Sequence, residues 1–154
     1  MSEFRPLLRA YRPETDTAYV VSSWLRSYAD AREIRDYLRA VHNGRKEPFY
    51  DAYRPTVEAL IARSQVLIAC LPEHSDAIVG YAVLEEPRFL HWAYTKSAFR
   101  RLGVARFLLG DFAALPLIVS HPSPLVRLPP NWSYQSRHRW KVPVNAYEVD
   151  RPNP

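Results

Sequence analysis

The sequence has few of the features that mark secreted or membrane proteins. Among its 154 residues there is one cysteine, so no internal disulfide can form. That cysteine, Cys70, lies in the apolar run "QVLIACL", which predicts a small buried side chain. No apolar run is long enough to cross a bilayer, and "MSEFRPLLRAYRPETD" at the N-terminus lacks the apolar stretch of a signal peptide. We therefore expect a cytoplasmic protein with no membrane partner.

Glycine is also scarce, with four glycines against fourteen prolines. The prolines crowd toward the C-terminal end, in "HPSPLVRLPPNW" and "DRPNP". Because proline interrupts helices, segment 122–154 is predicted to be extended and rich in loops. The length of the chain predicts a single domain over 1–154, of which this proline-rich segment is the atypical part.

The charge is unbalanced toward positive. Twenty-one Lys and Arg residues face sixteen Asp and Glu residues, which gives a formal net charge of +5. Such a surface favours anionic partners, namely a phosphorylated cofactor, an acidic substrate or nucleic acid. The charge alone does not choose among them.

The first half of the chain predicts one strand followed by helices. "LLRAYRPETD" reads as a short strand closed by Pro13, after which Thr15 or Asp16 is placed to cap a helix. The stretch "REIRDYLRAVHNGRKEPF" is amphipathic up to its "NG" turn. Two helical apolar faces flank this stretch, made by Val20, Val21, Trp24, Leu25 and Tyr28 and by Tyr53, Val57, Leu60 and Ile61.

The second half alternates short apolar runs with turns. "VLIACL" and "AIVGYAVLEE", separated by "PEHSD", predict an antiparallel hairpin, and "RFLHWAY" after Pro87 predicts a third consecutive strand. A helix over "GVARFLLGDFAA", a fifth strand in "LPLIVSH" and one or two edge strands in "RHRWKVPVNAYEV" follow. The order β-α-α-β-β-β-α-β predicts an α/β (α+β) fold, with a mixed, mostly antiparallel sheet flanked by helices.

One stretch carries a specific chemical signal: "TKSAFRRLGVARFLLGDF", residues 95–112. A strand ends, a basic turn with one glycine follows, and a helix begins. The first turn of a helix leaves backbone N–H groups unpaired, and Gly103 lets a ligand approach the backbone closely. Arg100, Arg101 and Arg106 supply charge-assisted hydrogen bonds to phosphate oxygens. The pattern predicts a pyrophosphate site, against the alternative of a flexible helix start with solvated arginines.

Within this stretch, "RRLGVA" (100–105) resembles the Arg/Gln-x-x-Gly-x-Gly/Ala signature of the GCN5-related N-acetyltransferase (GNAT) superfamily. The resemblance runs from about residue 7 to residue 121, and short phage-encoded GNAT-like proteins are similar in size and in this motif. The chain departs from the family pattern at three positions. Ser97 stands where Pro is common, Arg101 where Gly is frequent, and Ala105 where Gly is commoner.

The resemblance implies acetyl-CoA as cofactor and transfer of an acetyl group to a small-molecule or protein amine by direct attack. In the family the fourth and fifth strands splay apart, the fourth strand binds pantetheine through its backbone, and the signature cradles the pyrophosphate. The residues that would bind the cofactor here are Tyr94 and Thr95, then Arg100, Arg101, Leu102, Gly103, Val104, Ala105 and Arg106. The walls of the acceptor site would come from Trp24, Tyr28, Tyr50 and Tyr53.

Three residues are candidates for proton transfer in this scheme. His91 lies inside the expected fourth strand and titrates near neutrality, while Glu86, next to Glu85, ends the preceding strand. Tyr134 would protonate the thiolate from a loop, because the prolines after the fifth strand disfavour the helix that supplies this tyrosine in the family. The histidine and the glutamate each have a structural alternative: a hydrogen-bonded strand histidine and a solvated turn.

Other functions stay open at this stage. The main alternative is a catalytically inactive GNAT-fold binding protein with a protein or nucleic-acid partner. "NWSYQSRHRWK" interleaves aromatic and basic residues, as single-strand binders do, although an edge strand with inward aromatics explains the same letters. His91 and His121 could approach each other on adjacent strands, yet two histidines alone make a weak metal site. Homo-oligomerisation is also left open.

Overall fold

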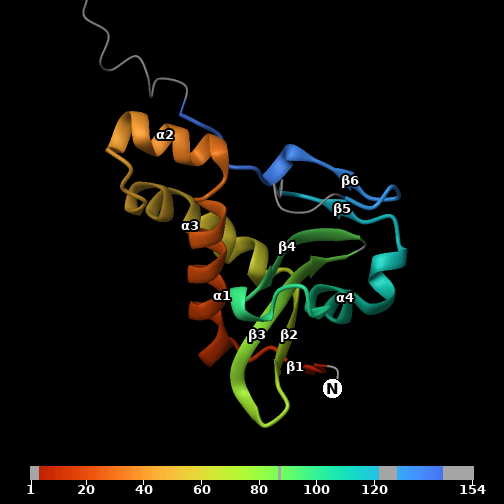
Figure 1. Cartoon of the computed structure of the whole chain (residues 1–154). Helices are drawn as coiled ribbons and strands as arrows, with labels where there is room; N and C mark the ends of the chain where they lie inside the picture. The colour runs from red at the N-terminus through yellow and green to blue at the C-terminus, as the bar shows by residue number, and fades with distance from the viewer. Residues whose placement is uncertain (1–3, 87, 122–127, 144–154) are drawn as a thin grey trace, which may run out of the picture.

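A computed structural model describes residues 4–86, 88–121 and 128–143. In chain order the first elements are β1 (Leu7–Ala10), α1 (Pro13–Tyr28), α2 (Arg32–His42), α3 (Glu47–Ala62), β2 (Gln65–Leu71), β3 (His74–Glu85) and β4 (Phe89–Thr95). The later elements are η1 (Ser97–Phe99), α4 (Val104–Leu109), η2 (Gly110–Ala114), β5 (Ile118–Val119), β6 (Ser133–Tyr134) and η3 (Ser136–His138). Figure 1 shows them coloured along the chain.

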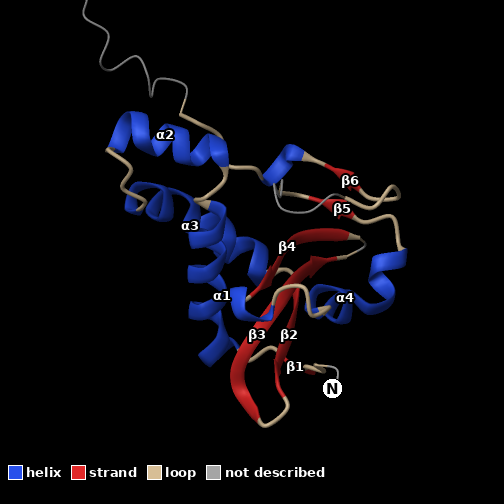
Figure 2. Ribbon diagram, viewed as in Figure 1, coloured by secondary structure: helices blue, strands red, loops and turns tan. Residues whose placement is uncertain are grey.

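The strands form one six-stranded sheet in the order β1-β2-β3-β4-β5-β6. Pairing is antiparallel from β1 to β4 and parallel between β4, β5 and β6. Figure 2 shows α1 and α3 on one side of the sheet and α4 on the other. The core is divided in the same way, with one apolar cluster under α1–α3 and a second under α4. The expected mixed, mostly antiparallel α/β sheet flanked by helices is confirmed.

Helix α1 begins earlier than the sequence suggested. Pro13 is its first residue instead of the end of the preceding strand, because proline fits the first helical position, where its missing N–H is not needed. Asp16 is therefore no N-cap: its carboxylate accepts hydrogen bonds from the backbone N–H of Arg12 and from the Arg9 guanidinium. The five residues of the expected apolar face, Val20, Val21, Trp24, Leu25 and Tyr28, are all buried.

Three helices, α1, α2 and α3, lie between β1 and β2, whereas the expected order has two helices there. The additional helix is α2. It ends at the "NG" turn, in which Asn43 and Gly44 both adopt positive φ values, 53° and 80°. Helix α3 then starts at Glu47 and continues through Pro55. Its four expected core residues, Tyr53, Val57, Leu60 and Ile61, are buried against the sheet.

Other element boundaries also differ. The hairpin between β2 and β3 is tighter than "PEHSD" suggests, because β3 already begins at His74. The helix expected over 103–114 ends at Leu109, since Gly110 takes a φ of 49° and the chain continues as the 3-10 turn η2. Strand β5 has two residues, and the described tail strand is β6, upstream of the expected edge strands. Pro87, residues 122–127 and residues 144–154 lie outside the described residues.

Cys70 is fully buried in β2, as its apolar surroundings indicate. Across the described residues, no helix has the length and apolar character needed to cross a membrane.

Candidate functional site

Strands β4 and β5 pair only over a short distance. Phe89 and Leu90 face Ile118 and Val119, and the last backbone hydrogen bond of the pair joins Ser120 N to Leu90 O at 3.1 Å. Beyond this point β4 continues to Thr95 with β3 on one side and, within the described part of the chain, no strand on the other. This divergence is the one that the resemblance implies, and it leaves backbone groups of β4 free to pair with a ligand.

A β-bulge marks the point of divergence. Val83 of β3 faces Trp92, but its neighbour Leu84 faces Leu90, so His91 is an extra residue on β4. Bulges bend a strand and increase its twist. Leu90 packs in the apolar cluster under α4, whereas Trp92 packs against the cluster under α1–α3. The bulge therefore places Leu90 and Trp92 on opposite faces of the sheet, at the point where β4 and β5 stop pairing.

The basic loop, residues 100–106, follows the end of β4 that does not pair with β5. Arg101 and Gly103 both have positive φ, 66° and 83°, and a Cβ built on Gly103 would meet no atom within 4 Å. Within residues 4–86, 88–121 and 128–143, the amide N–H groups from Leu102 to Arg106 have no hydrogen-bond acceptor. All residues of this loop except Val104 are exposed. The expected phosphate-binding residues thus form an exposed turn with open space beside Gly103.

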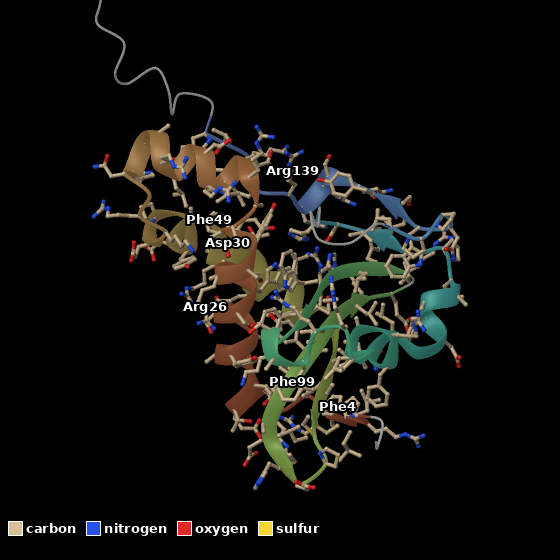
Figure 3. All side chains as sticks on the ribbon, in the orientation of Figure 1. Phe4, Arg26, Asp30, Phe49, Phe99 and Arg139 are labelled. Atoms are coloured by element: carbon tan, nitrogen blue, oxygen red, sulfur yellow. The ribbon has the colours of Figure 1, made fainter. Side chains whose placement is uncertain are left out.

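Two contacts fix this loop at the end of β4. A Cβ on Gly80 of β3 would come within 2.7 Å of Tyr94 O and 2.9 Å of a Val104 methyl group, so the absent side chain lets α4 begin tightly against the strands. Phe99 packs on Phe4 with ring centroids 5.3 Å apart, as Figure 3 shows. Packing thus fixes the start of α4 and the turn η1, and the exposed loop between them is left to bind a ligand.

The two expected strand residues have different surroundings. The ring of Tyr94 stacks on Tyr81 at 5.4 Å, and its backbone pairs with that residue of β3. The carbonyl of Thr95 accepts a hydrogen bond from Arg100 Nε at 3.2 Å. Arg100 therefore folds back over the end of β4, while Arg101 and Arg106 remain exposed.

Buried donors without acceptors lie on the same strand and on the helix beside it. Trp92 stacks on Trp24 of α1 with centroids 5.6 Å apart, and among the described residues neither indole N–H has a hydrogen-bond partner. Orphaned buried donors are rare, and an absent ligand is one physical explanation for them. The loop amides without acceptors among the described residues make the residues present compatible with the pyrophosphate of an acyl-CoA.

A line of polar side chains runs beneath the bulge. His91 Nδ1 and His121 Nδ1 each lie 2.7 Å from Ser120 Oγ. His121 Nε2 lies 2.5 Å from the hydroxyl of Tyr53 on α3, and that hydroxyl donates to the carbonyl of His138, also at 2.5 Å. At the other end, His91 Nε2 lies 3.5 Å from Glu85 Oε1. The two histidines thus approach each other, as their sequence positions allowed, with Ser120 between them.

Burial decides the protonation of these groups. It lowers the pKa of His91, against the opposing effect of the Glu85 carboxylate, and it lowers the pKa of His121 to about 3. Burial also raises the pKa of the Tyr53 phenol. For Glu85, burial is the largest single effect and opposes ionisation, but the hydrogen bond and charge of Arg63 together with the interaction with His91 outweigh it and lower the pKa. Near neutral pH both histidines are therefore uncharged and Glu85 is ionised.

The other candidate residues lie apart from this line. Glu86 is in the exposed turn after β3, and the carboxylate next to His91 belongs to Glu85. Tyr134 is on β6, which β5 separates from β4, and burial raises the pKa of its phenol. Sequence reasoning gave no role to Ser120 or to the Tyr53 hydroxyl, because no spacing links α3 to β5. The pair of strand histidines was the only available signal.

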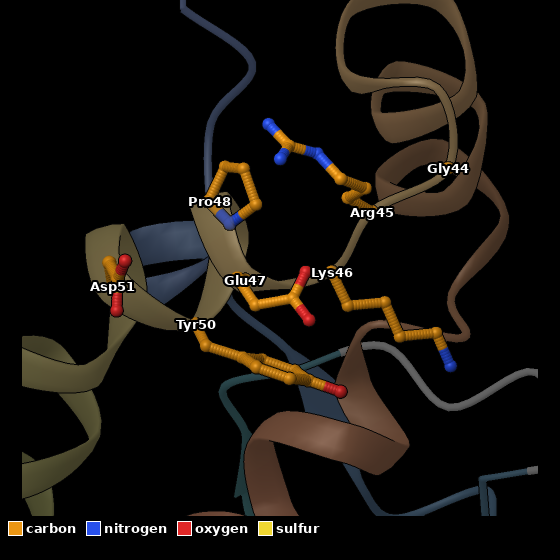
Figure 4. Close-up of a pocket in the computed structure, with 7 residues that line it drawn as sticks. All are labelled: Gly44, Arg45, Lys46, Glu47, Pro48, Tyr50 and Asp51. Atoms are coloured by element: carbon orange, nitrogen blue, oxygen red, sulfur yellow. The ribbon is translucent and has the colours of Figure 1, made fainter.

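The expected acceptor walls are distributed over two places. Trp24, Tyr28 and Tyr53 are core residues, with exposed fractions of 3% or less. Tyr50 lines a hollow of about 740 Å³ at the turn between α2 and α3, which Figure 4 shows. Basic Arg45 and Lys46 and acidic Glu47 and Asp51 share this hollow. It lies at the start of α3, whereas Arg63, the neighbour of Glu85, follows the end of that helix.

Two of the three aromatic residues of segment 131–141 pack inward, whereas Tyr134, Arg137 and Lys141 are exposed. Trp140 is buried in the core, and the half-buried Trp132 donates its indole N–H to Ala113 O at 3.2 Å. Arg139 forms an ion pair with Glu33 of α2. The packing of Trp132 and Trp140 fits the structural explanation for these two residues. In the part of the chain that the structure describes, no three His, Cys, Asp or Glu side chains gather as a metal site would require.

Comparison with known proteins places the fold. No protein-family model and no curated protein matches the sequence. Among solved structures, a GCN5-related N-acetyltransferase from Rhodopseudomonas palustris matches with a TM-score of 0.50 and 23% identity, over 74% of this chain and 67% of that one. A histone acetyltransferase HPA2 and related acetyltransferase from Corynebacterium glutamicum matches with a TM-score of 0.52 and 19% identity, over 72% and 71%. The chain therefore has a GNAT-like α/β fold.

Proposed function

We propose that the protein transfers an acetyl group from acetyl-CoA to an amine by direct attack, without a covalent enzyme intermediate. One observation carries this proposal. The edge of β4 from Trp92 to Thr95 has no partner in β5, and this edge leads directly into a basic loop with unpaired amides. The GNAT-like fold supports the proposal, although a fold alone does not imply an activity.

The chain would hold the cofactor in two parts. The amides from Leu102 to Arg106, with the guanidinium groups of Arg101 and Arg106, would bind the pyrophosphate. The free edge of β4 around Tyr94 would hydrogen-bond the pantetheine amides. When bound, acetyl-CoA supplies an acyl group activated as a thioester. The chain's own task is to exclude water and remove a proton from the acceptor amine.

Proton removal falls to groups near the bulge. His91 is uncharged near neutral pH and adjoins the ionised Glu85, so this pair offers a basic site in β4. Tyr134 stays the candidate proton donor to the leaving thiolate. Its raised pKa keeps the phenol protonated, as that role requires, and its strand is separated from β4 by β5.

The cofactor site is tested by calorimetric titration with acetyl-CoA, using two matched glycine variants. Gly103 and Gly44 have nearly equal φ values, 83° and 80°, and a Cβ on either would meet no atom within 4 Å. Alanine therefore imposes a similar backbone strain of about 1 kcal/mol at each site. We expect Gly103→Ala to weaken acetyl-CoA binding about fivefold or more and Gly44→Ala to leave it unchanged. Absence of saturable binding to the wild type would refute the proposal.

A non-catalytic binding protein is the second candidate, and one contact favours it. The hydrogen bond from Arg100 to Thr95 O engages a carbonyl at the end of the strand that the cofactor would pair with. Thiol release measured across a library of amines separates the two functions. Acetyl-CoA-dependent release with any amine supports the transferase, whereas binding without release across the library supports the alternative.

A further inference from the structure

The hydrogen bonds beneath the bulge can run in only one direction. The carbonyl of His138 has no proton, so the hydroxyl of Tyr53 must donate to it. That hydroxyl has a single proton, and therefore it can only accept at its other contact, with His121 Nε2. His121 must carry its proton on Nε2.

The same reasoning continues to the next two groups. A neutral histidine protonated on Nε2 has a lone pair on Nδ1, so His121 accepts the hydroxyl proton of Ser120. Having donated its proton, Ser120 Oγ accepts from His91 Nδ1. His91 is thus held as the Nδ1–H tautomer, and its Nε2 keeps a lone pair.

That lone pair lies in an unusual position. The His91 side chain is completely buried, and within the described residues its Nε2 has no hydrogen-bond donor. The ionised Glu85 carboxylate lies 3.5 Å from Nε2, so a lone pair faces a negative charge. A buried acceptor without a donor is unfavourable, and one added proton would satisfy both groups.

A pocket gives ligands access to Glu85, the partly exposed member of this pair. Glu85 lines a cavity of about 280 Å³ together with Arg63, Phe89, Arg137 and His138. The Glu85 side chain is 20% exposed, whereas His91 lies behind it. Arg63 bonds to Glu85 at 2.6 Å and to His138 Nε2 at 3.3 Å, which leaves Arg137 as a second cation on the wall.

We propose that Tyr53, His121 and Ser120 are positioning residues that fix the tautomer of His91, so that Glu85 and His91 together accept a proton from an amine bound in this pocket. The proposal rests on the proposed acyltransferase function. It names the groups that take the proton from the amine and the pocket through which that amine enters. The N–H bond of the ammonium breaks, its proton passes to Glu85 and then to Nε2 of His91, and the amine keeps the electron pair. The charged groups that act on His91 are Glu85 on β3 and Arg63 after α3, and its titratable neighbours are His138 and His121. Arg137 in η3 lines the same pocket.

The tautomers can be observed directly in long-range ¹H–¹⁵N NMR spectra of the labelled full chain near neutral pH. We expect His91 as the Nδ1–H form and His121 as the Nε2–H form. A His91 protonated on Nε2 would overturn the proposal. This result does not depend on acetyl-CoA binding or turnover, so it can fail separately from the proposed function.

The positioning role is tested by comparing two buried tyrosine variants. Tyr53→Phe removes the hydroxyl that sets the direction of the chain, and we expect both histidines to become tautomer mixtures. Tyr81→Phe is the matched control, because it also removes a buried hydroxyl. That hydroxyl bonds to Ser23 and to the carbonyl of Val20, and it takes no part in the hydrogen bonds that link Tyr53 to His91. Equal changes of the His91 nitrogen shifts in both variants would show a general structural effect and overturn the positioning role.

The proton-accepting pair is tested by removing one charge. Glu85→Gln keeps the shape of the side chain but removes the carboxylate near His91. The pKa of His91, measured by NMR titration, should therefore fall by about one unit. The substitution should also reduce amine acetylation about 100-fold. The control is Glu58→Gln on the exposed face of α3, for which neither quantity should change. An unchanged His91 pKa in Glu85→Gln contradicts the pair, whether or not the protein acetylates amines.

Discussion

At the scale of single residues, Asp16 shows how this chain keeps a charge inside. Its side chain is 3% exposed and the side chain of its partner Arg9 is 8% exposed. Two hydrogen bonds from the guanidinium, at 2.7 and 2.9 Å, and one from the backbone N–H of Arg12 satisfy the carboxylate. Burial opposes ionisation of Asp16, but these hydrogen bonds outweigh it and lower the pKa.

We therefore expect Asp16→Asn to destabilise the fold by about 3 kcal/mol at neutral pH, because it leaves the Arg9 charge buried without a counter-charge. The folded-state pKa of Asp16 is below its unfolded value, so the stabilisation is complete above the unfolded pKa. It is lost as the pH falls through the folded pKa. Chemical denaturation of both proteins over a pH series measures this, and their difference should shrink in acid.

Asp76→Asn is the control for this prediction. Asp76 also pairs with an arginine, Arg12, but its side chain is 94% exposed, so water screens the pair. A loss of stability as large as that of Asp16→Asn would contradict the role of burial.

The sequence was informative about buried apolar residues and uninformative about the polar line. The helical spacing of Val20, Trp24 and Tyr28 correctly predicts their burial. The contact between Tyr53 and His121 joins residues 68 positions apart, and no local pattern encodes it. Such polar contacts depend on the packing of α3 against the end of β5, which follows from the whole fold.

At the scale of elements, the junction of β3, β4 and α4 depends on Gly80. The side chain that this residue lacks would overlap the backbone carbonyl of Tyr94, which cannot move without shifting β4. It would also press on Val104, the first residue of α4, which is buried. The register of β4 on β3 and the start of α4 therefore share one contact.

We expect Gly80→Ala to lower the free energy of unfolding by about 1–3 kcal/mol, as overpacked core positions do. Because the shift is transmitted to Val104, acetyl-CoA binding should weaken as well. Thermal unfolding and calorimetric titration measure the two effects. Gly110→Ala serves as control, since a Cβ there would meet no atom within 4 Å and the strain would come only from its φ of 49°.

The types of the helices and strands were predicted better than the residues at which they begin and end. The three consecutive strands and the helix after the basic loop follow from apolar periodicity and are present. The early end of α4 comes from the left-handed backbone of Gly110, and the tight hairpin comes from pairing of His74 with Leu71. A proline inside α3 shows the same limit, because tertiary packing retains a helix that local preference would interrupt at Pro55.

At the scale of the whole molecule, the sheet changes from antiparallel to parallel at β4, and the bulge at His91 lies where the next strand diverges. The diverging neighbour β5 is parallel to β4, and the crossover through α4 connects the two strands. The same crossover carries the basic loop to the free end of β4. One connection thus accounts for both parts of the proposed cofactor site, and the sequence motif indicated only the loop.

The position of positive charge in the molecule leads to a last prediction. Acetyl-CoA carries several negative charges, so its binding should weaken as salt screens the exposed arginines of the loop. Arg101→Gln removes one loop charge and should make the affinity both lower and less dependent on salt.

Arg39→Gln is the control for this prediction. It removes an exposed charge on α2, which lies at the opposite end of the molecule from α4 in Figure 1, and it should leave the salt dependence unchanged. Calorimetric titrations over an about tenfold range of salt measure both variants, because the Debye length shortens about threefold over that range. Equal salt dependence in wild type and Arg101→Gln would mean that the loop does not contact the phosphates, since only a charge near the ligand can contribute to a screened attraction.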